Sequence, residues 1–337
     1  MIHKRAGVLA MAFGVAVLSS CSRGPSHPPK FADFHRAGPG VMEDEKKLAE
    51  LHAVFERAQL SPSDIASIRK RGNAREIIGA AMQTAIGDES SALLVKEGLA
   101  RGSNNPVIVT GAIKSVAQQA FREAPDKQAV ANLLRLLDEL ERLEADNGLS
   151  LCLRAYAHLK SGDTNAARST LQSAMRKPVL RLHGSELRRC VMEAALAVKY
   201  PRYTASMLAL GTLDMSTEIV ILGKGLLNDP QLDRATAEAV LELGRGQEAQ
   251  ASLFIDQLIA FSLQKQALAF LKPAGFEKEL DRIKEARERI KRATEFLDSA
   301  RAHKLSEDKW NKYYEKVFAK SELEATDELA VKMGRKL

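Results

Sequence analysis

The sequence predicts an all-α protein: an array of packed α-hairpins followed by a charged helical extension. Apolar residues make up 45% of the chain but aromatic residues only 5%, and Ala and Leu dominate the apolar set, which favours helices over strands. Apolar side chains recur three and four residues apart, the period of a helix with one buried face. No alternating apolar run is long enough to predict a strand. Residues 107–110 come nearest, and Pro106 before them suits a helix start equally well.

The first 20 residues are predicted to be a signal peptide. Residues 3–5 are basic, and the 13 residues from 6 to 18 are uncharged and largely apolar. An apolar run this short does not cross a bilayer and is typical of the core of a secretory signal.

Residues 18–21, Leu-Ser-Ser-Cys, resemble the lipobox of bacterial lipoproteins. The resemblance implies that the signal peptide is cut before Cys21 and that Cys21 carries acyl chains such as palmitate. Ser22 is not the Asp of the Gram-negative sorting pattern. The resemblance therefore implies an anchor in the outer membrane, facing the periplasm, if the host has two membranes. Several acyl chains hold a protein stably at a membrane, whereas a single chain does not.

Residues 21–41 are predicted to be a flexible tether behind the lipidated cysteine. Pro and Gly cluster at 24–29 and again at 37–40, and the segment has no apolar period. As a random coil, a linker of about 20 residues spans roughly 25 Å.

A helical repeat array is expected over residues 42–272, because caps, Gly and Pro divide this region into helix-length segments. Ser61 and Pro62 form a helix start, Gly72 ends that helix, and Asn73 caps the next one. Outside one hairpin described below, the expected helices are 43–60, 61–71, 73–86, 89–101, 106–123, 126–146, 216–227, 230–243 and 247–271.

One hairpin is the clearest unit of the array. Residues 149–178 read as two helices joined by a Gly-Asp turn, and such a pair cannot bury its apolar face alone. Its small and turn residues resemble those of a tetratricopeptide repeat: Ala155, Gly162, Asp163, Ala167 and Ala174. Where that family has aromatic residues, this hairpin has Leu151, His158 and Leu171.

The segment 186–213 fits the same register, although its turn lacks the Gly-Asp pair. The resemblance implies that both hairpins stack in a solenoid whose concave surface accepts a protein partner. Arg154 and Tyr156 are then candidate partner-binding residues.

Two cysteines, Cys152 and Cys190, fall at equivalent positions of these hairpins and on apolar faces. Stacked helix axes lie about 8–10 Å apart, while a disulfide needs Cα atoms within about 7 Å. The pair therefore either forms a disulfide or remains as two buried free thiols.

Residues 273–337 are predicted to form a separate, highly charged helical region resembling a short coiled coil. Residues 277–337 hold 16 basic and 14 acidic residues, so the region has a solvated surface rather than a basic patch. Apolar residues over 276–297 follow a heptad spacing, and this seam packs either within the chain or against a second copy. Trp310 and Tyr314 lie on an aromatic helix face that is either a docking surface for a partner or the contact of a closing helix.

The sequence contains no motif for nucleophilic catalysis, phosphate binding or metal binding, so no cofactor and no metal site are expected. The formal charge of +7, or +5 once Lys4 and Arg5 are removed with the signal peptide, is too scattered for nucleic-acid binding.

These features predict a lipid-anchored scaffold for proteins of the bacterial envelope, involved in assembly or secretion, rather than an enzyme. Glu89-Ser90 resembles the catalytic Glu-Ser pair of lytic transglycosylases, which leaves a cell-wall enzyme as one alternative. A structural lipoprotein that self-associates through its C-terminal seam is another.

Overall fold

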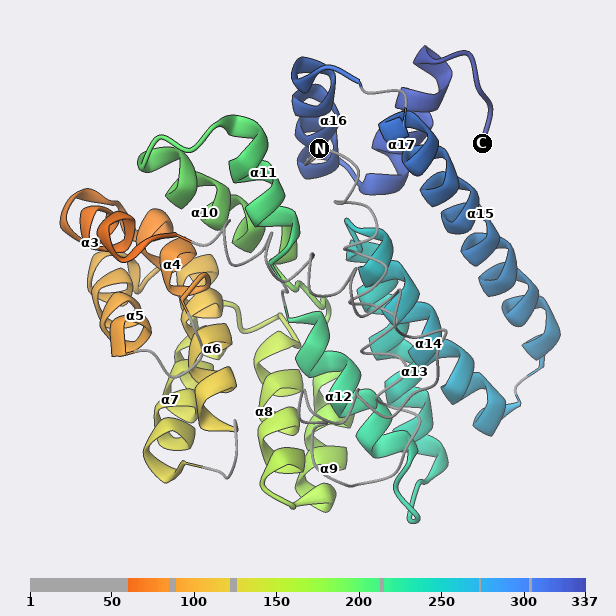
Figure 1. Ribbon diagram of the computed structural model, residues 1–337. Coiled ribbons are helices and arrows are strands. Elements are labelled where there is room, and N and C mark those ends of the chain that lie inside the picture. Colours follow the sequence, from red (N-terminus) through yellow and green to blue (C-terminus); the bar gives the residue numbers. More distant parts are fainter. Residues whose placement is uncertain (1–59, 85–88, 122–125, 213–214, 273, 303–304) are drawn as a thin grey trace, which may run out of the picture.

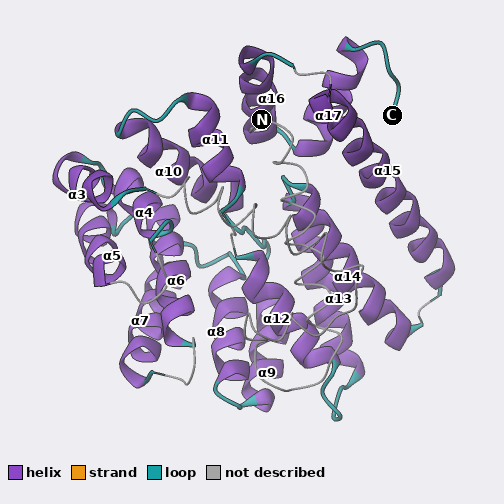
Figure 2. Ribbon diagram, in the orientation of Figure 1, coloured by secondary structure: helices purple, strands orange, loops and turns teal. Residues whose placement is uncertain are grey.

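The computed structural model describes residues 60–84, 89–121, 126–212, 215–272, 274–302 and 305–337. Within these ranges the chain is all-α, as predicted (Figure 2). The helices are α3 (Pro62–Arg71), α4 (Ala74–Ala81), α5 (Glu89–Gly102), α6 (Pro106–Ala120), α7 (Lys127–Leu143), α8 (Leu149–Lys160), α9 (Thr164–Ala174), α10 (Gly184–Ala197), α11 (Arg202–Leu210), α12 (Ser216–Leu227), α13 (Arg234–Gln250), α14 (Phe254–Leu271), α15 (Phe276–Ala302), α16 (Glu307–Ala319) and α17 (Glu322–Lys332).

The expected hairpin is present as α8 and α9, which pack against each other. Gly162 takes a positive φ of 85° in the turn, a conformation that costs glycine little. Asp163 caps α9 by accepting a hydrogen bond from the amide N of Ala166 at 2.9 Å. Ala155 and Ala167 are fully buried, so the two helices approach closely where the sequence has small residues.

The following pair, α10 and α11, does not take the next place in the stack. In Figure 1 it lies above the hairpin, where α10 packs against α4, and α12 takes the place beside α8. Gly79 explains the close crossing of α4 and α10, because a Cβ atom there would lie only 2.0 Å from the carbonyl oxygen of Cys190. The side-by-side arrangement of the two expected repeats is therefore wrong, although both hairpins form.

This rearrangement separates the two cysteines. Cys152 lies in the main core and Cys190 in a small cluster with Val107 and Leu187. Both are buried free thiols, which is one of the two alternatives that the sequence left open.

The boundary between α13 and α14 differs from the predicted one. The sequence predicts a helix end at Leu243, but α13 continues through Gly244 to Gln250. A Cβ atom on Gly244 would lie 2.9 Å from the Cγ of Gln264 and 3.2 Å from the Ala260 carbonyl oxygen. This glycine therefore permits close packing of α13 on α14 instead of ending a helix.

The C-terminal region continues the same core. The apolar seam residues Ile283, Ile290 and Leu297 are buried on α15, which packs against α14 and α17. The amide N of Glu322 donates a 2.7 Å hydrogen bond to the Ser252 carbonyl oxygen, joining the start of α17 to the segment before α14. The seam thus packs within the chain.

The last helices also meet the displaced hairpin, at the top of Figure 1. There α16 packs against α11. An Arg202–Glu315 ion pair at 3.0 Å and a 2.7 Å hydrogen bond from Arg189 to the Phe318 carbonyl oxygen join the two parts.

Candidate functional site

A groove of about 800 Å³ runs between α5 and α7, with the end of α6 as its floor. Its apolar lining consists mainly of Val95, Leu99, Val116 and Leu136. Val95 and Leu136 are buried, whereas Leu99 and Val116 are partly exposed to the groove. The groove therefore presents apolar surface that no described segment of the chain covers.

The spacing of residues on α5 explains why a groove forms. Lining residues occur from Ser91 to Ser103 at steps of three to four, which keeps them on one face of the helix. The opposite face is occupied, since a Cβ atom on Gly98 would lie 2.8 Å from the Ile78 side chain of α4. At 1.5 Å per residue the lined length of α5 is about 18 Å, or three helical turns.

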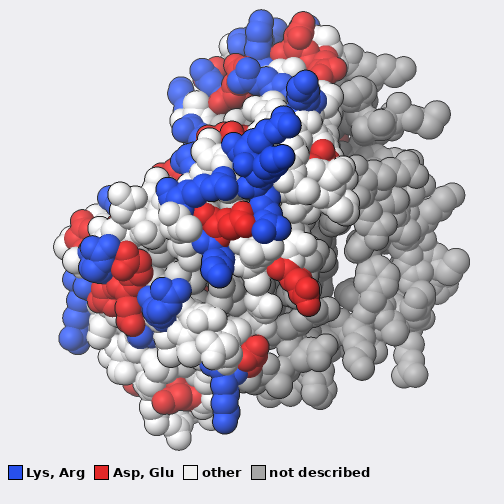
Figure 3. Space-filling model, turned by 90° about the vertical axis from the view of Figure 1, so that its left-hand side faces the viewer, with Lys and Arg blue, Asp and Glu red and all other residues white. Residues whose placement is uncertain are grey.

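The charges around the groove are not balanced. On α7, Asp138 pairs with Arg154 at 2.6 Å, and Glu139 pairs with Arg142 at 2.6 Å. Lys96 on α5 and Arg135 on α7 line opposite walls, and neither forms an ion pair with a described residue. Figure 3 shows this side of the molecule, where basic and acidic side chains alternate and uncharged surface lies between them. Arg135 also attracts Glu139 from a greater distance, so the groove lining holds three basic groups, Lys96, Arg135 and Arg142, against the two acidic groups Asp138 and Glu139.

Most of the residues predicted to bind a partner are in the core. Tyr156 is 6% exposed and packs edge-on against Phe121, with ring centroids 5.6 Å apart. Trp310 and Tyr314 are 2% and 3% exposed, and they stack against each other where α16 meets α11. This corrects the expectation of a docking surface there: the aromatic face is used to close the array.

Arg154 alone among the four lies near a candidate surface. Its ion pair with Asp138 places it beside the rim of the groove, although it does not line the groove itself. Cys21, the predicted lipidation site, lies outside the described residues. Glu89 is exposed at the start of α5 and does not line the groove.

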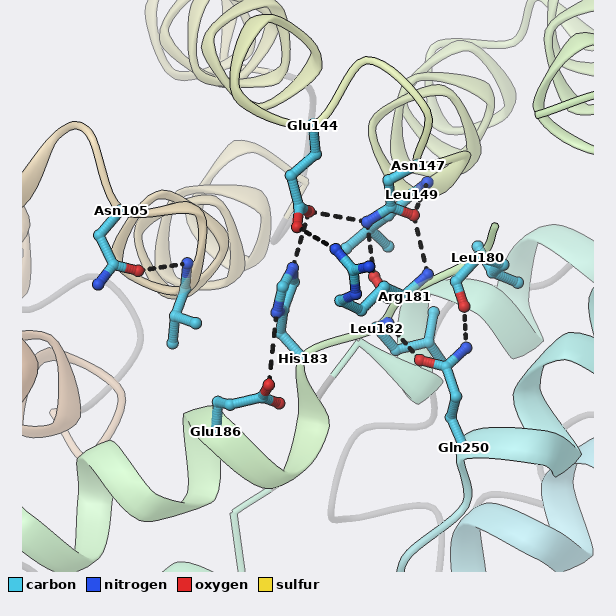
Figure 4. Close-up of polar contacts among 11 residues, drawn as sticks. Asn105, Glu144, Asn147, Leu149, Leu180, Arg181, Leu182, His183, Glu186 and Gln250 are labelled. Carbon is cyan, nitrogen blue, oxygen red and sulfur yellow. Dashed lines mark hydrogen bonds and ion pairs between the residues drawn. The ribbon is translucent and has the colours of Figure 1, made fainter. Parts of the chain in front are cut away.

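A polar cluster that the sequence did not reveal lies where the segment before α10 meets the C-terminal end of α7 (Figure 4). Nε2 of His183 lies 2.8 Å from Oε2 of Glu144, at the C-terminal end of α7, and Nδ1 lies 3.9 Å from Oε1 of Glu186 on α10. Arg181 donates a 2.7 Å hydrogen bond to the other oxygen of Glu144. Asn147 accepts hydrogen bonds from the amide N atoms of Leu149 and Arg181 at 3.1 and 2.8 Å.

The cluster holds the extended segment that carries the chain from α9 back to α10. Residues 175–183 make this crossing, and Val179 forms an isolated parallel bridge with Asn147. Gln250 holds the same segment from α13 by accepting a 2.8 Å hydrogen bond from the amide N of Leu182. His183 is 4% exposed and has a φ of 56°, so this side chain is fixed by a constrained backbone.

Electrostatics favour a charged imidazole in this cluster. Burial alone lowers the pKa of His183, but Glu186 and Glu144 outweigh that effect and raise it above the usual value. The nearby His183 is the largest cause that lowers the pKa of Glu186, to about 2. Nε2 of His183 and both oxygens of Glu144 are bonded within the cluster, so the cluster has a structural role.

A second cavity, of about 730 Å³, adjoins this cluster. Its basic residues are already paired: Arg181 with Glu144, Arg289 with Asp327, and Lys320 with Glu324 at 3.4 Å. The α5–α7 groove, with its excess of basic side chains, is therefore the better candidate for a binding site.

Among the residues that the structure describes, no three His, Cys, Asp or Glu side chains lie together so that they could hold a metal ion. No helix in the same ranges is both long and apolar enough to span a bilayer. Comparison of the chain with protein families, with curated proteins and with solved structures finds no match in any of the three.

Proposed function

We propose that this chain is a lipid-anchored lipoprotein that binds a protein partner of the bacterial envelope in its α5–α7 groove. The groove is the observation that carries the proposal, because it combines partly exposed apolar residues with an excess of basic over acidic side chains. The lipobox at residues 18–21 supports the anchor, and the 21–41 tether would let the helical body reach partners near the membrane.

Neither alternative gains support from the geometry. A general acid needs a cleft that shields it from water and places it near the bond to be cleaved, and Glu89 is exposed outside the groove. Self-association through the 276–297 seam needs its apolar residues at the surface, and Ile283, Ile290 and Leu297 are buried.

Site-specific photo-crosslinking in intact envelopes tests the proposal. A p-benzoylphenylalanine residue replaces Ala92, which is exposed and lines the groove. The matched control carries the same residue in place of Lys265, which is exposed on α14. We expect a discrete protein adduct from position 92 and none of the same mass from position 265.

The anchor is tested separately by fatty-acid labelling of wild type and of Cys21→Ser. We expect label and outer-membrane fractionation for wild type only. Absence of a position-92 adduct from an anchored, folded protein would remove the groove as the site of function. If wild type neither incorporates the fatty-acid label nor fractionates with the outer membrane, the lipoprotein assignment is wrong.

A further inference from the structure

We infer that the occupant of the α5–α7 groove is an acidic amphipathic α-helix of about three turns, contributed by the partner protein. This inference rests on the proposed function and names the chemistry of the partner that the same groove would recognise. The length of the groove, its walls, their backbone and the charges of its lining all favour a helix of this kind.

The dimensions fit a short helix. The lined face of α5 extends from Ser91 to Ser103, about 18 Å, which matches roughly 12 residues of helix but only five or six of extended chain. The α5 wall is lined by small side chains on either side of Lys96, namely Ser91, Ala92, Ala100 and Ser103. Small side chains let a third helix pack near the lower end of the usual 8–10 Å interaxial distance.

The backbone of the walls also favours a helix over an extended peptide. Both walls are helices, so their amide and carbonyl groups are bonded internally and offer no sheet edge for strand addition. An extended peptide in the groove would leave its own backbone groups without partners. A helix forms its backbone hydrogen bonds internally. It needs only apolar side chains at steps of three and four to pack against Leu99, Val116 and Leu136 of the groove.

The charges specify acidic flanks. The acidic groups of the groove, Asp138 and Glu139, are already neutralised by Arg154 and Arg142. Lys96 and Arg135 lie on opposite walls; Lys96 forms no ion pair with a described residue, and Arg135 shares Glu139 with Arg142. A helix lying between them meets a positive charge on each side of its apolar stripe, so Glu or Asp on both flanks complements the groove and Lys or Arg is repelled.

Fluorescence anisotropy with two designed peptides tests this inference. Both are 18-residue helix formers with Leu at steps of three and four, and they differ only in carrying Glu or Lys on the two flanks. The protein is the chain from residue 21 with Cys21→Ser, so that it is soluble. We expect the Glu peptide to bind at least tenfold more tightly than the Lys peptide at 50 mM salt, and the difference to shrink at 500 mM salt.

The protein variants then locate the site. Lys96→Glu with Arg135→Glu should weaken binding of the Glu peptide about tenfold, since two attractions become repulsions. Lys160→Glu with Lys265→Glu makes the same charge change at exposed positions of α8 and α14 and should change the affinity less than twofold. Lys96→Gln with Arg135→Gln provides a second test with an intermediate loss, and thermal unfolding of every variant checks that it is folded.

Equal affinities for the two peptides, or equal losses in the groove and control variants, would overturn the inference. If position 92 still yields a partner adduct in that case, the proposed function stands and only the chemistry assigned to the partner is wrong. A position-92 adduct with the twofold mass of this chain would identify a second copy as the occupant and would also overturn it. If the Glu peptide discriminates as expected but no envelope adduct forms, the groove chemistry stands and the proposed cellular role fails.

Discussion

His183 lies between carboxylates contributed by two elements, and its titration should make stability depend on pH. Glu144 faces it from α7, Glu186 from α10, and Arg181 approaches Glu144 from the crossing segment. Because the pKa of His183 is raised in the fold, its stabilisation is fully present below the unfolded pKa of about 6.5 and is lost as pH rises through the folded value. Glu186 has the opposite sign: its stabilisation is present above pH 4.5 and is lost as pH falls toward 2.

The variant His183→Asn tests this account, since Asn tolerates the left-handed backbone at this position. Urea unfolding should show wild type to be roughly 1–3 kcal/mol more stable than the variant at pH 5.5, because charge-assisted hydrogen bonds are lost. The difference should narrow at pH 8.5. An equal difference at both pH values would show that the imidazole acts by packing alone.

Gly79 makes a second prediction at the residue scale. Gly79→Ala places a methyl group against the backbone of Cys190, which cannot move without shifting α10. Unfolding should show a loss of roughly 3 kcal/mol, the upper part of the range for overpacked sites. Ser103→Ala, which changes an exposed position directly after α5, should stay within about 0.5 kcal/mol of wild type. Comparable effects of the two substitutions would contradict the tight crossing.

At the scale of elements, the position of the displaced hairpin determines how reactive the thiols of Cys152 and Cys190 are. Burial raises the pKa of both Cys152 and Cys190 to about 12, so neither thiol reacts readily while the protein is folded. In a non-reduced sample of the soluble Cys21→Ser chain, a thiol reagent should detect no reactive cysteine in the native state. It should detect both in guanidinium chloride. Failure to detect thiols after unfolding would indicate a disulfide and a different placement of α10.

The elements also show what the sequence could predict. Caps and helix-length periodicity are local signals, so Ser61, Asn73 and the Gly162 turn mark their boundaries correctly. The predicted helix end at Leu243 is wrong because a glycine that permits close packing, such as Gly244, cannot be distinguished in the sequence from one that ends a helix. The aromatic face of α16 left two alternatives open, because periodicity predicts an apolar face but does not say whether the chain itself covers that face.

Local sequence signals do not predict the order in which the helices stack. The placement of α10 depends on contacts such as Glu144 with His183, which are 39 residues apart. The groove depends on residues of three helices, and its excess of basic charge depends on ion pairs of Asp138 and Glu139 that the sequence does not show. Fold class and helix positions could therefore be predicted, while the arrangement of the array and its binding surface could not.

At the scale of the whole molecule, two buried ion pairs connect distant parts of the chain. Lys114 on α6 contacts both carboxylate oxygens of Glu218 on α12 at 2.8 Å, and Arg188 on α10 contacts both oxygens of Asp256 on α14 at 3.0 and 2.9 Å. The side chains of the first pair are 3% and 4% exposed. Such pairs add little net stability compared with apolar residues, but loss of one partner leaves a buried charge uncompensated.

A double-mutant cycle on Lys114 and Glu218 tests whether this pair connects α6 to α12. Lys114→Met alone and Glu218→Leu alone should each destabilise the protein by roughly 3–5 kcal/mol, because each leaves a desolvated charge. The double variant should recover most of that loss, since apolar side chains of similar size then face each other. The control cycle uses Arg234→Met and Glu238→Leu at an exposed ion pair and should show a coupling energy below about 1 kcal/mol. Additive effects at Lys114 and Glu218 would mean that these two side chains, and with them α6 and α12, do not meet as the structure shows.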